Sequence, residues 1–164
     1  MNPSVTVRHA VPDDIDAIDE LLKLYSGSGV VLPRPKDDIA SHLGNFRVAE
    51  ADHKIIGCAA ARDFGNDLLE IRSLVVHPTM QGQGVGKLIV RHVIEEMRQT
   101  RKNWRLFALT QRPEFFRTQG FREVPKALFP EKIWSDCSKC VKRQRCDEAA
   151  VLLDASEGTD GTGN

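Results

Sequence analysis

A glycine-rich turn between an apolar strand and an amphipathic helix constrains this chain more than any other feature. Residues 69–76 are rich in branched apolar side chains, which favour a strand, and residues 81–87 read Gln-Gly-Gln-Gly-Val-Gly-Lys. Glycine lets the backbone approach a ligand closely, and a helix N-terminus offers unpaired N–H groups to an anion. The turn therefore predicts a phosphate site. Apolar residues after it recur at helical spacing: Val85, Leu88, Ile89, Val93 and Met97.

Two common nucleotide-binding motifs do not fit this turn. A P-loop would need glycine in place of Gln81 and a hydroxyl residue in place of Leu88. A dinucleotide fingerprint would need glycine in place of Lys87. The pattern that fits is Gln-x-x-Gly-x-Gly, with Gln81, Gly84 and Gly86 at the defined positions. A glycine-rich turn that binds no ligand is the alternative.

Length and charge limit the kind of protein. With 164 residues we expect one domain over residues 1–154, and a disordered tail over residues 155–164, which are rich in glycine, threonine and acid. The 23 basic and 23 acidic residues cancel, which disfavours a general nucleic-acid-binding role. No apolar run is long enough for a membrane helix, and the N-terminal residues lack the apolar core of a signal peptide. We therefore expect a cytoplasmic protein with no membrane partner.

Hydrophobic periodicity predicts alternating strands and helices along the chain. Two glycines and two prolines in residues 26–35 indicate a loop. Residues 51–53 indicate a turn that joins two strands into a hairpin. The predicted strands cover residues 5–8, 46–50, 55–61, 69–76, 104–109, 121–124 and 149–153, and the predicted helices cover residues 12–25, 37–43, 84–97 and 114–118.

The turn, after the Leu-Val-Val-His-Pro of residues 74–78, resembles the acetyl-CoA pyrophosphate loop of the GCN5-related N-acetyltransferase (GNAT) family. The resemblance extends from Val5 to about Leu153. It implies an α/β fold with a mixed, mostly antiparallel sheet, helices on both faces of the sheet, and acetyl-CoA as cosubstrate. It also implies backbone hydrogen bonds to the pantetheine arm from Leu74, Val75 and Val76, and pyrophosphate contacts from Gln81, Gly82, Gln83, Gly84, Val85, Gly86 and Lys87.

Four further segments, residues 29–34, 109–116, 119–121 and 128–132, resemble the acetyltransferase domain of N-acetylglutamate synthases. That family acetylates the α-amine of L-glutamate, the first step of arginine biosynthesis. Arg34 and Arg112 match positions near the family's substrate pocket, and guanidinium groups suit the carboxylates of glutamate.

Several alternatives stay open at this point. The acceptor could be another small amine or a protein N-terminus, and a non-catalytic CoA-binding module is an alternative of another class. No amino-acid-kinase domain accompanies the resemblance, so inhibition by arginine is open, and so is assembly into a homodimer.

The chemistry requires a base, because an α-ammonium must lose a proton before it can attack a thioester. Glu70 is our candidate, acting directly or through water, because it precedes Leu74 by four residues, where many members of the family carry a basic glutamate. The alternative is an ion pair with Arg72, since both residues fall on one strand face. The tyrosine that donates a proton in many members is replaced by Phe116, which has no proton to give.

Three cysteines near the C-terminus, Cys137, Cys140 and Cys146, form a Cys-x2-Cys-x5-Cys pattern. They could supply three ligands of a zinc site, but the fourth ligand is unassigned, so we assign no metal. The resemblance implies a structural clip here and no catalytic role. Cys58 stands alone in an apolar stretch, which is typical of a core residue.

Overall fold

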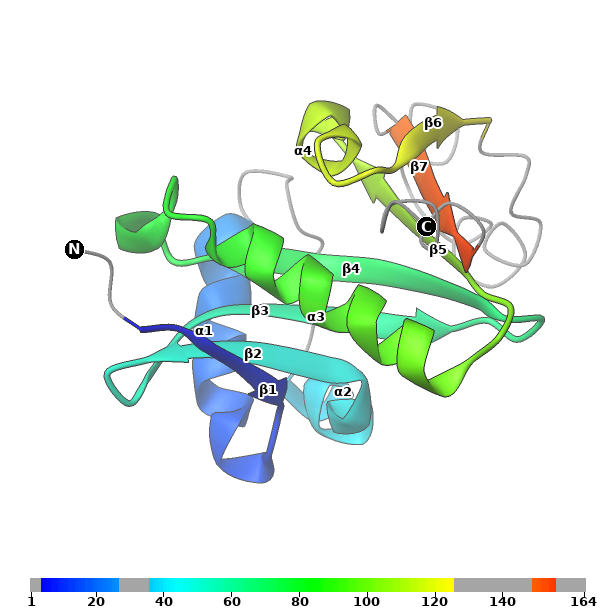
Figure 1. Cartoon of the computed structure of the whole chain (residues 1–164). Coiled ribbons are helices and arrows are strands. Elements are labelled where there is room, and N and C mark those ends of the chain that lie inside the picture. Colours follow the sequence, from blue (N-terminus) through cyan, green and yellow to red (C-terminus); the bar gives the residue numbers. More distant parts are fainter. Residues whose placement is uncertain (1–3, 27–35, 126–148, 156–164) are drawn as a thin grey trace. The chain divides into compact units, whose positions relative to one another are not determined.

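The computed structural model describes residues 4–26, 36–125 and 149–155, and its helices and strands follow the predicted order (Figure 1). Residues 27–35 of the predicted loop and residues 156–164 of the predicted tail lie outside the described residues. The strands are β1 (Thr6–His9), β2 (Phe46–Ala51), β3 (Lys54–Asp63), β4 (Leu68–Val76), β5 (Arg105–Thr110), β6 (Arg122–Val124) and β7 (Ala149–Asp154). The helices are η1 (Pro12–Asp14), α1 (Ile15–Ser26), α2 (Lys36–Ser41), η2 (Leu43–Asn45), η3 (Pro78–Met80), α3 (Val85–Thr100) and α4 (Pro113–Arg117).

The strands form one sheet in the order β1-β2-β3-β4-β5-β7-β6. Strand β4 pairs with β5 in parallel, whereas β1–β2, β2–β3, β5–β7 and β6–β7 pair antiparallel. The predicted mixed, mostly antiparallel sheet is therefore confirmed. By contacts the chain divides into two compact units, one within Met1–Arg62 and Ile71–Glu96 and the other within Asp63–Glu70 and Met97–Asn164. The single domain over residues 1–154 stays a prediction.

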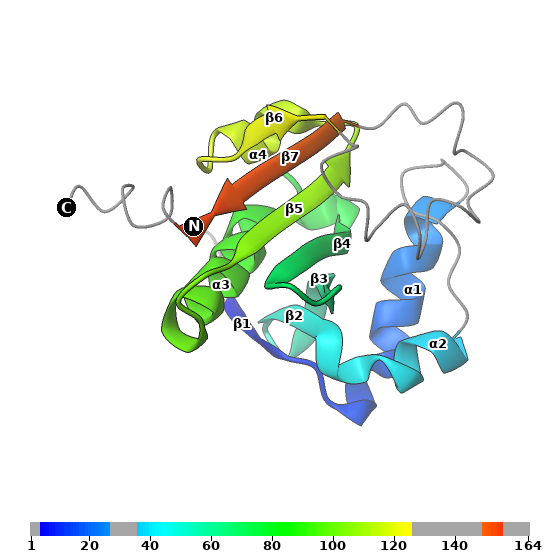
Figure 2. The same cartoon turned by 90° about the vertical axis from the view of Figure 1, so that its right-hand side faces the viewer.

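The first unit has helices on both faces of its strands. Helices α1 and α2 lie against one face of β2 and β3, and α3 lies against the other (Figure 2). The pattern follows from strand alternation, because successive residues of β3 point to opposite faces. The core on the α1 side consists of Ile18, Leu21, Leu22, Ile39, Phe46, Val48, Cys58, Ala60 and Val75. Cys58 is fully buried there, so its predicted place in the core is confirmed.

Gly57 on β3 allows α3 to pack closely against the sheet. A Cβ at this position would lie 3.2 Å from Cδ1 of Ile89 and 3.2 Å from the carbonyl oxygen of Val75. We expect Gly57→Ala to lower the free energy of unfolding by about 1–3 kcal/mol, because overpacking forces the helix or strand to shift. Urea denaturation would measure the change. Gly44→Ala is the matched control, since a Cβ there would meet nothing within 4 Å, and an equal loss in both variants would contradict this account.

The second unit packs an apolar cluster on its own strands. Buried residues of β4, β5 and β7 contribute Leu68, Phe107, Ala150 and Leu152, with Phe64, Leu109 and Val124 packed against them. In β5 and β7, Leu106 pairs with Leu153 and Ala108 pairs with Val151. None of the described helices combines the length and the apolar character that a bilayer crossing requires.

Candidate active site

The predicted phosphate turn follows the end of β4 and is anchored at its start. The backbone N–H of His77 donates to the carbonyl of Ile56 on β3 at 2.7 Å, and the N–H of Met80 donates to the carbonyl of His77 at 2.8 Å. The His77 ring caps η3, where its Nδ1 accepts from the N–H of Thr79 at 3.3 Å. The chain therefore enters residues 81–84 from a fixed position on the sheet.

The turn itself is exposed and has the conformation that only glycine adopts easily. Gly82 has a φ of +80° and Gly84 a φ of +82°, and a Cβ on either residue would meet nothing within 4 Å. The carbonyl of Gly84 accepts from the N–H of Leu88 at 3.1 Å in the first turn of α3. The N–H groups at the beginning of a helix have no intrahelical partner, so this end of α3 offers donors to an anion.

The first residue of the turn is tied to α1 by a hydrogen-bond relay. Tyr25 donates from its hydroxyl to the carbonyl of Val76 at 2.5 Å, and that hydroxyl accepts from Nε2 of Gln81 at 2.6 Å. Tyr25 is the last residue of the helix predicted over residues 12–25, and hydrophobic periodicity carries no signal for a contact between residues so far apart. The relay fixes the end of β4 and the beginning of the turn relative to each other.

Strand β4 changes conformation at Ser73, whose φ of +56° is left-handed. Left-handed backbone is uncommon for residues other than glycine, and it interrupts the regular alternation of the strand. The carbonyl of Ser73 accepts from the thiol of Cys58 at 3.8 Å. The sequence gives no sign of this irregularity, because serine is not a residue that favours φ > 0. It falls directly before Leu74, Val75 and Val76.

Glu70 lies in the second unit, on the first part of β4. Only 3% of the residue is exposed, which is uncommon for a carboxylate. It pairs with Phe107 at the end of a parallel ladder that covers Leu68–Glu70, while β4 continues to Val76. That Glu70 acts as a general base stays a prediction.

Arg112 also lies in the second unit, directly after β5 and at the N-cap of α4. Its side chain is exposed, and its backbone N–H donates to Oγ1 of Thr110 at 2.9 Å. Arg34 and the cysteines at positions 137, 140 and 146 fall outside the described residues.

Phe116, at the position where the resemblance led us to look for a proton-donating tyrosine, packs in an aromatic cluster with Phe115 and Phe121. The residue is 4% exposed, and its ring makes edge contacts with Phe115 at 5.0 Å and with Phe121 at 5.2 Å between centroids. Edge-to-face packing of this kind stabilises aromatic clusters. The side chain at this position therefore packs in an apolar surrounding.

Comparison with known proteins finds similarity to acetyltransferases. The profile of the Acetyltransferase (GNAT) domain matches residues 42–123. An uncharacterized N-acetyltransferase of Chlorobaculum tepidum is 37% identical over 146 residues, which cover 89% of this chain and 94% of the relative. An amino-acid acetyltransferase of Mycobacterium tuberculosis is 35% identical over 121 residues, which cover 72% of this chain and 68% of the relative.

A solved structure extends the likeness to the whole fold. N-acetylglutamate synthase from Neisseria gonorrhoeae, complexed with coenzyme A and N-acetyl-glutamate, superposes with a TM-score of 0.81 at 27% sequence identity. The superposition covers 94% of this chain and 36% of that longer chain. This chain thus spans about a third of the synthase that it matches.

Proposed function

Because the chain belongs to the GNAT family of N-acetyltransferases, with acetyl-CoA as cosubstrate, we propose that its acceptor is the α-amine of L-glutamate. The observation that carries this proposal is the match of nearly the whole chain to an N-acetylglutamate synthase domain. The exposed guanidinium of Arg112 at the end of β5 supports it, because glutamate is recognised through carboxylates. The product would be N-acetyl-L-glutamate, and the reaction would serve arginine biosynthesis.

We assign the diphosphate of acetyl-CoA to the turn of residues 81–87. The backbone N–H groups of the turn and of the beginning of α3 would donate to phosphate oxygens, and the exposed Lys87 would add a positive charge. The main chain of Leu74, Val75 and Val76 would hold the pantetheine arm. When bound, acetyl-CoA supplies an acetyl thioester whose carbonyl carbon accepts the amine.

We assign the removal of the amine proton to Glu70. The Glu70 carboxylate would take one proton from the α-ammonium, directly or through a water, so that the neutral amine can attack the thioester carbon. As the N–C bond forms and the C–S bond breaks, the nitrogen would release its excess proton to solvent. CoA leaves as a thiolate, which is an adequate leaving group because a thiol of this kind has a pKa of about 8.5. Phe116 has no proton to donate, so the thiolate takes its proton from water.

A substrate panel at fixed acetyl-CoA tests the proposed acceptor, with release of free thiol as the readout. We expect kcat/KM for L-glutamate to exceed that for L-glutamine by about ten-fold or more, because glutamine lacks one charge-assisted hydrogen bond. Spermidine and a peptide with a free N-terminus represent the other acceptor classes. Equal or faster reaction with any of these amines would refute glutamate specificity while leaving acetyl transfer intact.

Arg112→Ala is expected to raise the KM for glutamate about ten-fold, because one carboxylate anchor is lost. The KM for acetyl-CoA should stay the same, and kcat should change little, since the anchor holds the ground state and the transition state alike. Steady-state thiol release measures all three constants. Arg117→Ala is the matched control: Arg117 is an exposed arginine on α4 that pairs with Glu123 at 3.1 Å. A similar KM effect in both variants would speak against a specific role for Arg112.

A further inference from the structure

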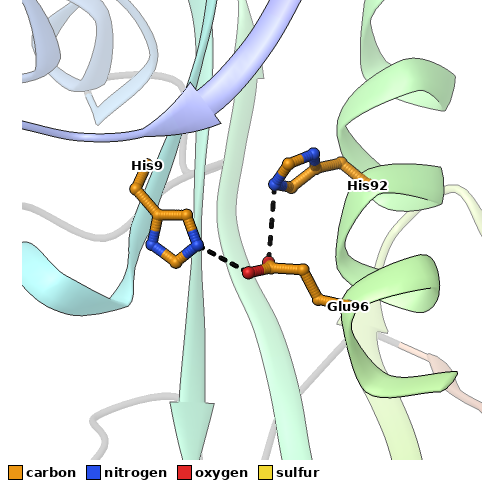
Figure 3. A group of neighbouring side chains, drawn as sticks. All are labelled: His9, His92 and Glu96. Atoms are coloured by element: carbon orange, nitrogen blue, oxygen red, sulfur yellow. Dashed lines mark hydrogen bonds and ion pairs between the residues drawn. The ribbon is translucent and has the colours of Figure 1, made fainter. Parts of the chain in front are cut away.

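Three side chains that the proposed reaction does not use converge in the first unit. His9 comes from β1, and His92 and Glu96 come from adjacent turns of α3 (Figure 3). Nε2 of His9 lies 2.5 Å from Oε2 of Glu96, and Nε2 of His92 lies 3.5 Å from Oε1 of Glu96. One potential ligand atom from each residue lies within 4.8 Å of the other two. Two imidazoles and a carboxylate therefore face one small volume.

His92 has a nitrogen available for a ligand. Its Nε2 is buried and makes no hydrogen bond to any residue that the structure describes. Buried polar atoms are nearly always satisfied, so an exception calls for an explanation. Burial, together with the positive charge of Arg47, outweighs the nearby carboxylate and lowers the pKa of His92. An unsatisfied imidazole nitrogen beside a second imidazole and a carboxylate is available as a metal ligand.

Glu96 is held as a carboxylate next to the two histidines. Burial opposes the charge, but hydrogen bonds from Arg47 and His9 together lower the pKa of Glu96. The Nε of Arg47 donates to Oε1 at 2.7 Å, which leaves Oε2 directed at His9. An outer hydrogen bond of this kind commonly fixes the orientation of a metal ligand.

We propose that His9, His92 and Glu96 form a binding site for Zn²⁺ or a similar borderline divalent cation. Two imidazole nitrogens and one carboxylate oxygen are ligands that zinc accepts in a tetrahedral site, with water as the fourth ligand. Zinc–ligand bonds of about 2.0–2.1 Å place ligand atoms about 3.3 Å apart, so Nε2 of His9 and Oε2 of Glu96, which lie 2.5 Å apart, would separate while His92 rotates toward them. Magnesium and calcium prefer oxygen ligands and do not fit this set.

The place of the site indicates a structural role. At a rise of about 1.5 Å per residue, His92 and Glu96 lie about 10 and 16 Å along α3 from Val85 at the glycine turn. An ion there would lie well away from the glycine turn. It would instead join α3 to β1, a strand of four residues at the edge of the sheet. Binding should therefore raise thermal stability and leave the acetyltransferase rate unchanged.

Calorimetric titration of the metal-stripped full chain with Zn²⁺ tests the site. The three cysteines are replaced together, as Cys137→Ser, Cys140→Ser and Cys146→Ser, so that thiolates cannot bind the ion. We expect one equivalent of Zn²⁺ to bind and to raise Tm by several degrees, because a ligand of the native state stabilises it. His92→Gln and His9→Gln should each weaken binding about ten-fold or more, whereas His53→Asn, a change in an exposed turn histidine, should have no effect.

Titration of the unmodified chain with Co²⁺ keeps the proposal testable if the cysteine variant does not fold. Cobalt bound to imidazole and carboxylate gives no intense thiolate charge-transfer band, so absorption separates this site from a cysteine site. Loss of the weaker visible bands in His92→Gln would support the proposal. Zinc binding that neither histidine variant alters, a cobalt spectrum with thiolate bands only, or no binding at all would overturn it.

Discussion

Replacement of Glu70 by glutamine is expected to lower kcat for the proposed acetylation of glutamate by about 100-fold or more, the usual contribution of a positioned general base. Glutamine has nearly the same shape as glutamate but cannot take up a proton. The substitution keeps the volume at a residue that is 3% exposed, so the packing around β4 should survive.

A second strand glutamate provides the control. Glu50 lies on β2 and forms an ion pair with Arg8 at 3.2 Å, away from the strand that leads to the turn. Glu50→Gln removes the same charge and should leave kcat unchanged. If Glu70→Gln retained kcat within two-fold, Glu70 would have no role as the base. Loss of activity together with loss of the folded circular dichroism spectrum would instead identify Glu70 as a structural residue.

Gly84→Ala is expected to raise the KM for acetyl-CoA about 30-fold, because the turn would lose charge-assisted hydrogen bonds to the diphosphate. The φ of +82° at Gly84 costs a residue with a Cβ about 1–2 kcal/mol. Relief of that strain would rotate the peptide planes that carry the N–H donors. Calorimetric binding of CoA, which needs no acceptor amine, would measure the loss directly.

Gly65→Ala separates loss of binding from loss of stability. Gly65 also has a φ of +82°, lies in a turn between β3 and β4, and would place its Cβ in open space. The two variants should therefore lose similar free energy of unfolding, but only Gly84→Ala should bind CoA weakly. Equal CoA affinity in both would rule out the glycine turn as the diphosphate site.

The glycine turn and the surrounding elements could be predicted because their signals are local. Val75 in the apolar run of residues 69–76 is buried, and so are Val85, Ile89, Val93 and Met97 of the predicted stripe of α3. Leu88, which the spacing also assigned to that stripe, is 42% exposed, so the prediction was wrong for this residue. The resemblance to the GNAT family, and the fold that it implied, are confirmed. The roles of Glu70, Arg34 and Arg112 stay predictions.

Contacts between distant segments could not be predicted in the same way. The spacing of His92 and Glu96 was visible on the predicted helix, but the third member of the group, His9, is set by how β1 lies beside α3. The left-handed backbone of Ser73 depends on its place in the sheet and has no signature in the residue itself. The resemblance pointed to the absent tyrosine at Phe116, and only the structure shows the aromatic cluster that the ring joins.

The relay through Tyr25 has a practical consequence, because the chain contains a single tyrosine. Its phenol bridges Gln81 and the end of β4, beside the turn assigned to the diphosphate. Isotope labelling of tyrosine would therefore yield one magnetic resonance signal from this position. The Tyr25 signal would therefore report whether a ligand occupies the glycine turn, without any added dye or tag.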